Sequence, residues 1–200
     1  MTRVYRQGPY TLVVKEAAGI DAEVTGRLVD CWRASYARMA LRFNPHAAQS
    51  VHLEITDGYQ GAAEAEGNRI TLSASHIRAR PWDSDVMTHE MFHIVQAYQD
   101  FEGPQWAMEG LADYARFRYG LYNQQGGWFL SDFSPSQRYT DSYRITARFL
   151  VWLENHIYGR IAEDLDQKLR AGCYSEGFWA TVMGRGLDQL WSDYGAKPEL

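Results

Sequence analysis

His89, Glu90 and His93 have the residue types and the spacing that metal-dependent hydrolysis requires. They lie in the stretch His89–His93, which reads HEMFH and fits the pattern H-E-x-x-H. On a helix the two imidazoles project from one face about one turn apart, which suits two corners of a tetrahedral zinc site. Glu90 directly follows the first histidine and can reach a water that the metal activates, so we predict that it is the general base.

A second acid pair can complete this site, because a zinc site with two histidines needs a carboxylate ligand. Glu109 and Asp113 are four residues apart, so on a helix they share a face. We predict that Glu109 is the third ligand and that Asp113 accepts the other ring N–H of a ligating histidine. The alternative, two solvated acids, fits poorly because apolar and aromatic side chains crowd the same turns. These side chains are Trp106, Leu111, Tyr114 and Phe117.

Two consecutive helices must position these residues. Capping candidates in Pro81–Asp85 precede a helix that we expect over about residues 84–100. Phe101–Pro104 is a short breaker, and a second helix is expected over about residues 104–119. Because a short loop makes consecutive helices antiparallel neighbours, Glu109 can reach the histidine pair.

The remaining patterns predict an α+β fold. A long amphipathic helix covers Ala22–Phe43, and Gly58–Gly67 has the composition of a polar loop. The predicted strands are Tyr10–Lys15, Ser50–Thr56 and Asn68–Ser73. The later helices are predicted over about residues 142–158, 160–171, 176–183 and 186–194. We therefore expect one domain over residues 1–200, with a small mixed N-terminal sheet, a long helix, a mainly helical C-terminal half and an active-site cleft between the halves.

Composition narrows the functional classes. The chain has 200 residues, is 46% hydrophobic and carries a net charge of −5, which favours neither nucleic acid nor a membrane surface as a partner. The N-terminus lacks the apolar segment of a signal peptide, so we expect a cytoplasmic protein, or a secreted one if a leader was removed. Cys31 and Cys173 lack C-x-x-C spacing, and a disulfide between them is possible but not implied. The sequence does not determine the oligomeric state.

Four stretches of the chain carry a family resemblance. They are His89–Gln96 (HEMFHIVQ), Glu109–Arg116 (EGLADYAR), Tyr143–Leu150 (YRITARFL) and Gly186–Tyr194 (GLDQLWSDY). The first two resemble the gluzincin arrangement, H-E-x-x-H followed by E-x-x-x-D. All four, in this order and spacing, resemble the basic secretory protein family of plant and bacterial peptidases over about residues 50–195. The chain departs from the family name, because it is acidic and shows no leader.

This resemblance implies a zincin-like fold in which the strand before the active helix forms the upper edge of the cleft. Asn68–Ser73 is that strand, and an extended peptide could bind by adding a strand to it. Alternatively, the Gly58–Gly67 loop covers this edge. Tyr143 opens the family-like Y-x-x-T-A-R-F pattern and can donate to the developing oxyanion, with packing as its other role. Tyr139 is a weaker candidate, and Arg148 fits a structural ion pair better than a contact with substrate.

Three functions remain open. In a zinc-dependent peptidase or amide hydrolase, Zn²⁺ polarises the scissile carbonyl while Glu90 takes a proton from water and passes it to the leaving amine. A cytoplasmic tailoring hydrolase for one small amide or peptide would use the same chemistry. A non-catalytic zinc-holding domain fits less well, since it has no use for a base and is usually closed by four protein ligands. Three N/O ligands suit Zn²⁺ best but also admit Co²⁺ or Mn²⁺. Gln96 is expected behind the ligands or lining the core, and the other histidines are expected to be ordinary surface or core residues.

Overall fold

A computed structural model describes residues 2–141 and 143–200. Ser142, where the helix predicted over residues 142–158 begins, lies outside the described residues. The chain forms two compact units. The first runs to Ala97 and resumes over Ala115–Phe129, and the second comprises Tyr98–Tyr114 and Leu130–Leu200. The single domain expected over residues 1–200 stays a prediction.

A five-stranded sheet forms the scaffold of the first unit. Its strands are, in spatial order, β1 (Thr2–Gln7), β2 (Tyr10–Glu16), β3 (Ser50–Thr56), β5 (Arg69–Ser73) and β4 (Ala63–Glu66). The inner pairs β2–β3 and β3–β5 are parallel, whereas the outer pairs β1–β2 and β4–β5 are antiparallel. The predicted mixed sheet, and with it the α+β class, is confirmed.

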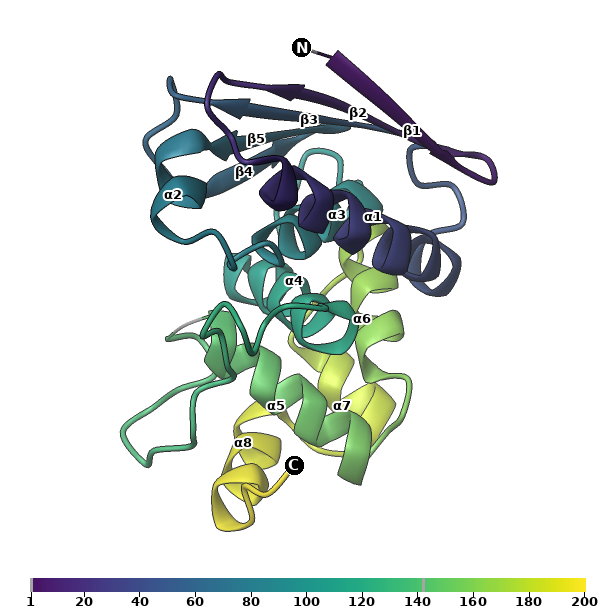
Figure 1. Cartoon of the computed structure of the whole chain (residues 1–200). Coiled ribbons are helices and arrows are strands. Elements are labelled where there is room, and N and C mark those ends of the chain that lie inside the picture. Colours follow the sequence, from purple (N-terminus) through teal and green to yellow (C-terminus); the bar gives the residue numbers. More distant parts are fainter. Residues whose placement is uncertain (1, 142) are drawn as a thin grey trace. The chain divides into compact units, whose positions relative to one another are not determined.

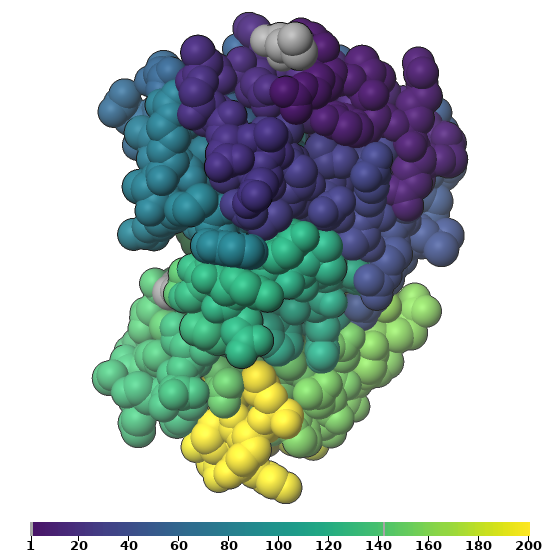
Figure 2. All heavy atoms as spheres, in the orientation of Figure 1, coloured from purple at the N-terminus to yellow at the C-terminus, as the bar shows by residue number. Residues whose placement is uncertain are grey.

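Alternating side chains give this sheet one buried face. The apolar residues buried on it are Leu12, Val14, Val51, Leu53, Ile55, Ile70 and Leu72. Helices α1 (Ala22–Phe43) and α3 (Val86–Gln96) lie along this face (Figure 1). In the space-filling view, the first two strands and α1, purple to indigo, form one continuous surface (Figure 2). The α1 helix has the bounds that its apolar periodicity predicts.

The predicted loop over Gly58–Gly67 is wrong in its second half, which forms strand β4. Glu66 pairs with Arg69, so Gly67 and Asn68 form a two-residue hairpin turn. Gly67 adopts the left-handed region (φ 58°) that such a turn requires. The alternation Ala-Glu-Ala-Glu concealed the strand, because both residue types are depleted in strands. As a consequence β4, and not the Asn68–Ser73 strand, is the edge of the sheet.

Two further elements escaped prediction, namely strand β1 and the short helix α2 (Ala74–Ala79). In addition, α3 ends at Gln96 and not near Asp100. Ala97 adopts a left-handed conformation (φ 46°) and donates its N–H to the carbonyl of His93, which closes the last turn. Ala has no special preference for this conformation, so composition did not mark the helix end.

Helices form the second unit. They are the first part of α4 (Gln105–Tyr119), then α5 (Tyr143–His156), α6 (Ile161–Arg170), α7 (Gly177–Met183) and α8 (Leu187–Ala196). Aromatic rings fill the core, and Phe149 lies 5.1 Å from Trp191 and 5.5 Å from Tyr194 between ring centroids. Among the helices of the described residues, none is long and apolar enough to cross a membrane. Cys31 and Cys173 are free thiols, the first buried and the second exposed.

Candidate metal centre

Helix α3 carries His89, Glu90 and His93, and a buried carboxylate fixes where this helix begins. Asp85 is the N-cap residue, yet its side chain caps no helix N–H. Its carboxylate accepts hydrogen bonds from Thr88 Oγ1 (2.8 Å), Cys31 Sγ (3.3 Å) and the backbone N–H of Tyr122 (2.5 Å). His89 follows one turn later and donates its N–H to the Asp85 carbonyl at 3.3 Å. One contact within this turn and two with other segments, α1 and the segment around Tyr122, thus hold the turn that precedes the histidine pair.

The two imidazoles approach each other through their Nε2 atoms. His89 Nε2 and His93 Nε2 are 3.1 Å apart, and the ring centroids are 4.9 Å apart at an interplanar angle of 78°. Two nitrogens that bind one tetrahedral zinc ion at ~2.0–2.1 Å would be about 3.3 Å apart. The spacing of the ring nitrogens therefore matches that of two ligands of one ion.

Gln96 contacts the opposite side of the His93 ring. Its side-chain oxygen Oε1 is 2.7 Å from His93 Nδ1, and the Gln96 side chain is buried. The sequence placed Gln96 behind the ligands or in the core, and the structure shows it buried and in contact with the candidate ligand His93.

Glu109 on α4 supplies the carboxylate of the predicted set. One ligand-type atom from each of His89, His93 and Glu109 lies within 4.8 Å of the others. Two imidazole nitrogens and one carboxylate oxygen form the donor set of His₂Glu catalytic zinc sites. A cation bound among the two ring nitrogens and the Glu109 carboxylate would offset the concentration of lone pairs and negative charge there. This group could therefore hold a metal ion.

Glu90 is buried, at 6% exposure, beside the first histidine. Tyr59 interacts electrostatically with Glu90. Its hydroxyl donates to the carbonyl of Ala63 on β4 at 3.2 Å. Burial raises the pKa of Tyr59, and the negative charges of Glu64 and Glu90 raise it further. Tyr59 lies in the irregular segment before β4, where neither spacing nor periodicity distinguishes it from the other tyrosines.

Tyr143, Glu109 and Asp113 interact electrostatically in the second unit. Burial raises the pKa of Tyr143, and the carboxylates of Glu109 and Asp113 contribute to the same shift. The Tyr143 hydroxyl therefore stays a proton donor at neutral pH, while its side chain is 47% exposed. A Cβ at position 110 would collide with the Thr146 side chain, so Gly110 permits the close approach of α4 and α5 that places Tyr143 near these acids.

Tyr139 and Arg148, in contrast, have structural partners. The Tyr139 hydroxyl donates to Asp188 Oδ1 at 3.1 Å, and burial followed by Asp188 raises its pKa to about 12. Its ring packs edge-on against Trp106. Arg148 donates to the carbonyl of Pro198 at 2.9 Å. This contact is structural, as predicted, but the acceptor is a backbone carbonyl and not an acidic side chain.

A buried ion pair connects the segment before α3 to the end of α4. Arg116 Nη2 and Asp83 Oδ1 are 2.5 Å apart, and the Arg116 side chain is only 6% exposed. Arg116 Nε donates to Asn123 Oδ1 at 3.0 Å, and the guanidinium lies 4.5 Å from the ring centroid of Trp128. His76 Nε2 lies 2.9 Å from the other Asp83 oxygen. His76 was expected to be an ordinary histidine, but it belongs to this network.

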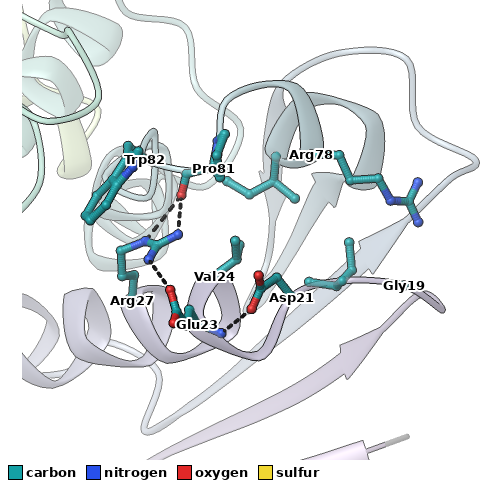
Figure 3. A pocket seen from close by; sticks show the side chains of 10 residues that line it. Gly19, Asp21, Glu23, Val24, Arg27, Arg78, Pro81 and Trp82 are labelled. Carbon is teal, nitrogen blue, oxygen red and sulfur yellow. Dashed lines mark hydrogen bonds and ion pairs between the residues drawn. The ribbon is translucent and has the colours of Figure 1, made fainter.

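A cavity of about 370 Å³ lies at the N-terminal end of α1, where Trp82 and Arg27 form part of its wall (Figure 3). Arg27 lies over the Trp82 ring at 4.3 Å and donates to the carbonyl of Pro81 at 2.9 Å and 3.3 Å. None of the described residues that line this cavity belongs to α3 or to the predicted site. The cavity is therefore separate from the candidate metal centre.

The whole segment that carries these features matches one protein family. The chain belongs to the family described as the peptidase of plants and bacteria, which it matches over residues 15–194. This finding confirms the family resemblance seen in the sequence. No match was found among curated proteins.

Solved structures show where the fold recurs. An M1 zinc metallopeptidase from Deinococcus radiodurans superposes with a TM-score of 0.56 at 16% identity, covering 100% of this chain and 51% of that chain. A mutant two-domain M1 zinc metallopeptidase bound to L-tryptophan gives a TM-score of 0.54 at 17% identity, with 100% and 49% covered. The chain thus spans about half the length of these proteins. At such identity the likeness shows a shared fold.

Proposed function

We propose that this protein is a zinc-dependent peptidase in which His89, His93 and Glu109 bind the ion. The observation that carries the proposal is the grouping of their ligand atoms within 4.8 Å. Three protein ligands leave one tetrahedral position open, as catalytic zinc sites do, whereas structural sites are closed by four. The membership in a peptidase family supports hydrolysis of a peptide bond. The donor set suits Zn²⁺ best and would also accept Co²⁺ or Mn²⁺.

When bound, zinc would act as a Lewis acid on the scissile carbonyl and make water a stronger nucleophile at neutral pH. Glu90 takes the proton of the attacking water and passes it to the leaving amine. Glu90 is buried directly after the first histidine, where its carboxylate can reach that water. The Tyr143 hydroxyl donates to the oxyanion that forms on the carbonyl.

Asp113 completes this arrangement as the acceptor for His89. A ligating histidine almost always donates its second ring N–H to a nearby acceptor. Because Gln96 occupies Nδ1 of His93, the histidine left for Asp113 is His89. Asp113 is buried, at 5% exposure, which is unusual for a solvated helix acid.

An extended peptide is the substrate class that the sheet favours. Strand β4 forms one of the two edges of the sheet, and α3 is among its neighbours in space. Backbone groups on such an edge can pair with an added strand.

The other candidates are a tailoring hydrolase for one small amide and a zinc-holding domain without turnover. Activity on a mixture of peptides would favour the proposed peptidase over a tailoring hydrolase. Retention of zinc without any turnover would indicate a zinc-holding domain. The zincin-like cleft, the cytoplasmic location and the lack of nucleic-acid or membrane partners stay predictions.

The decisive experiment compares Glu90→Gln with His93→Ala on a mixture of unstructured peptides. Glu90→Gln should keep one zinc ion per chain and lose ~10²–10⁴-fold in activity, because an amide cannot accept the proton. His93→Ala should lose the metal itself. Glu23→Gln, at an acid whose side chain is 84% exposed, is the matched control and should behave like wild type. Near-normal turnover by Glu90→Gln would refute the general-base role.

A further inference from the structure

We propose that Gln96 is a positioning residue for metal binding, whose amide oxygen fixes the tautomer of His93. This inference rests on the proposed zinc site. It assigns to a neutral side chain a task that carboxylates and backbone carbonyls usually perform in metal centres.

The contact between the two side chains determines which ring nitrogen carries the hydrogen. Gln96 Oε1 lies 2.7 Å from His93 Nδ1. A carboxamide oxygen only accepts hydrogen bonds, so Nδ1 must be the donor. A neutral imidazole carries a single N–H, which leaves Nε2 with its lone pair available. Nε2 is the atom that faces His89 at 3.1 Å, and it is therefore the atom that can ligate the ion.

The backbone holds Gln96 where this contact forms. Gln96 is the last residue of α3, three positions after His93, and its side chain is 1% exposed. Ala97 leaves the helix in a left-handed conformation and donates to the His93 carbonyl at 3.1 Å. Asn44 Nδ2 donates to the carbonyl of Val95 at 2.8 Å. The last turn of α3 is thus fixed on both sides of Gln96, which limits the rotamers open to its side chain.

The neutrality of Gln96 distinguishes it from Asp113, the acceptor proposed for His89. An amide orients the ring without adding negative charge near the metal. Glu109 then carries the single formal charge of the proposed ligand set. Loss of such a partner typically weakens metal affinity or activity ~10–100-fold. A carboxylate at position 96 would also accept the Nδ1 hydrogen and would make the imidazole more basic as a ligand.

Two substitutions separate orientation from packing. Gln96→Met keeps a side chain of similar shape without the amide oxygen, and Gln96→Glu restores an acceptor. We expect Gln96→Met to bind zinc ~10–100-fold more weakly than wild type in competition with a chelator, and Gln96→Glu to bind at least as tightly as wild type. Gln124→Met, at an exposed glutamine, is the control and should match wild type. Thermal unfolding of each metal-free variant checks that the fold is retained.

Nitrogen NMR of the histidine rings in the metal-free protein gives a readout that does not involve activity or metal. Wild type should show His93 with its hydrogen on Nδ1, and Gln96→Met should show a mixture of tautomers. Unchanged zinc affinity and an unchanged His93 tautomer in Gln96→Met would overturn the inference while leaving the zinc site in place. Failure of wild type itself to bind zinc would contradict the proposed function, and with it the role of Gln96.

Discussion

In the unit that carries His89 and His93, buried charges determine the local packing, whereas aromatic rings do so in the second unit. Asp85 accepts three hydrogen bonds at the start of α3, and Asp83 faces both Arg116 and His76. The second unit packs its core around Phe149, with rings that meet over a wide range of angles. Hydrogen bonds depend steeply on angle and distance, while aromatic contacts tolerate several geometries. Directional contacts are therefore concentrated around the histidine pair, whereas Glu109, the third candidate ligand, belongs to the unit with the aromatic core.

The largest expected effect comes from breaking the buried ion pair. Arg116→Met leaves Asp83 without its guanidinium partner and should lower the free energy of unfolding by ~3–5 kcal/mol. Arg116→Lys should recover only part of this loss, because an ammonium cannot reproduce the bond to Asn123 and the contact with Trp128. Urea denaturation of both variants measures the two values. If Arg116→Lys were as stable as wild type, the contacts that the guanidinium makes with Asn123 and Trp128 would contribute nothing to stability.

A dependence of stability on pH is expected from Asp166, a buried carboxylate of the second unit whose pKa is strongly raised. Burial raises the pKa of Asp166 from 3.8 to about 7, while Arg170 lowers it in part. The native state therefore binds this proton more tightly than the unfolded state. The stabilisation is complete below about pH 4 and is lost as the pH rises through about 7.

Wild type should accordingly lose stability relative to Asp166→Asn between pH 4 and pH 8, by roughly 3 kcal/mol. The asparagine still accepts the hydrogen bond that Tyr98 donates to Asp166 Oδ1 at 2.9 Å. Denaturant midpoints at several pH values measure the difference. Parallel pH profiles for the two proteins would show that the side chain titrates alike in the folded and unfolded states.

The aromatic core should tolerate a change of shape better than the polar network does. Phe149→Leu keeps most of the buried apolar volume and should cost less than ~1.5 kcal/mol. Phe149→Ala, which leaves a cavity, should cost ~3–5 kcal/mol and shows that the position is truly buried. Thermal and urea unfolding of the pair test this contrast. A loss for Phe149→Leu as large as that for Arg116→Lys would erase the distinction between the two regions.

The smallest effect is expected at an exposed ion pair of the same length as the buried one. Arg185 and Asp193 are 2.5 Å apart, with side chains 42% and 39% exposed. Water and salt screen such pairs, so Arg185→Met should change the free energy of unfolding by less than ~1 kcal/mol. The same measurement on Arg116→Met provides the contrast. A large loss at Arg185 would mean that burial is not what makes the Asp83 pair important.

Periodicity predicted the inner strands and all helices of the described residues except the short α2, because each buries one apolar face. The bounds of α1 and β3 followed from that pattern alone, and the spacing of the histidines and acids identified the set that lies close in space. Strand β4 was missed because pairing with β5, not propensity, stabilises it, although Gly67-Asn68 was a usable hairpin signal.

The supporting contacts of the site were less accessible to sequence reasoning. Arg116 and Tyr59 acquire partners, Asp83 and Glu90, from segments distant in the chain, and spacing does not reveal such contacts. His76 contacts Asp83 only seven residues further on, but across an irregular segment to which no periodicity applies. Gln96 was noticed for its place one turn after His93, but its contact with Nδ1 required coordinates. Local spacing therefore yields candidate ligands of a helical metal site, whereas the side chains that contact them depend on tertiary packing.

X-ray absorption at the zinc edge, on protein with its metal content measured, tests the central claim most directly. We expect one zinc ion per chain, surrounded by nitrogen and oxygen at ~2.0–2.2 Å with the scattering pattern of two imidazoles. Glu109→Gln should change the oxygen contribution and leave the two imidazoles in place. A sulfur ligand at ~2.3 Å, which would implicate Cys31 or Cys173, or a spectrum with no imidazole, would contradict the assignment of His89, His93 and Glu109.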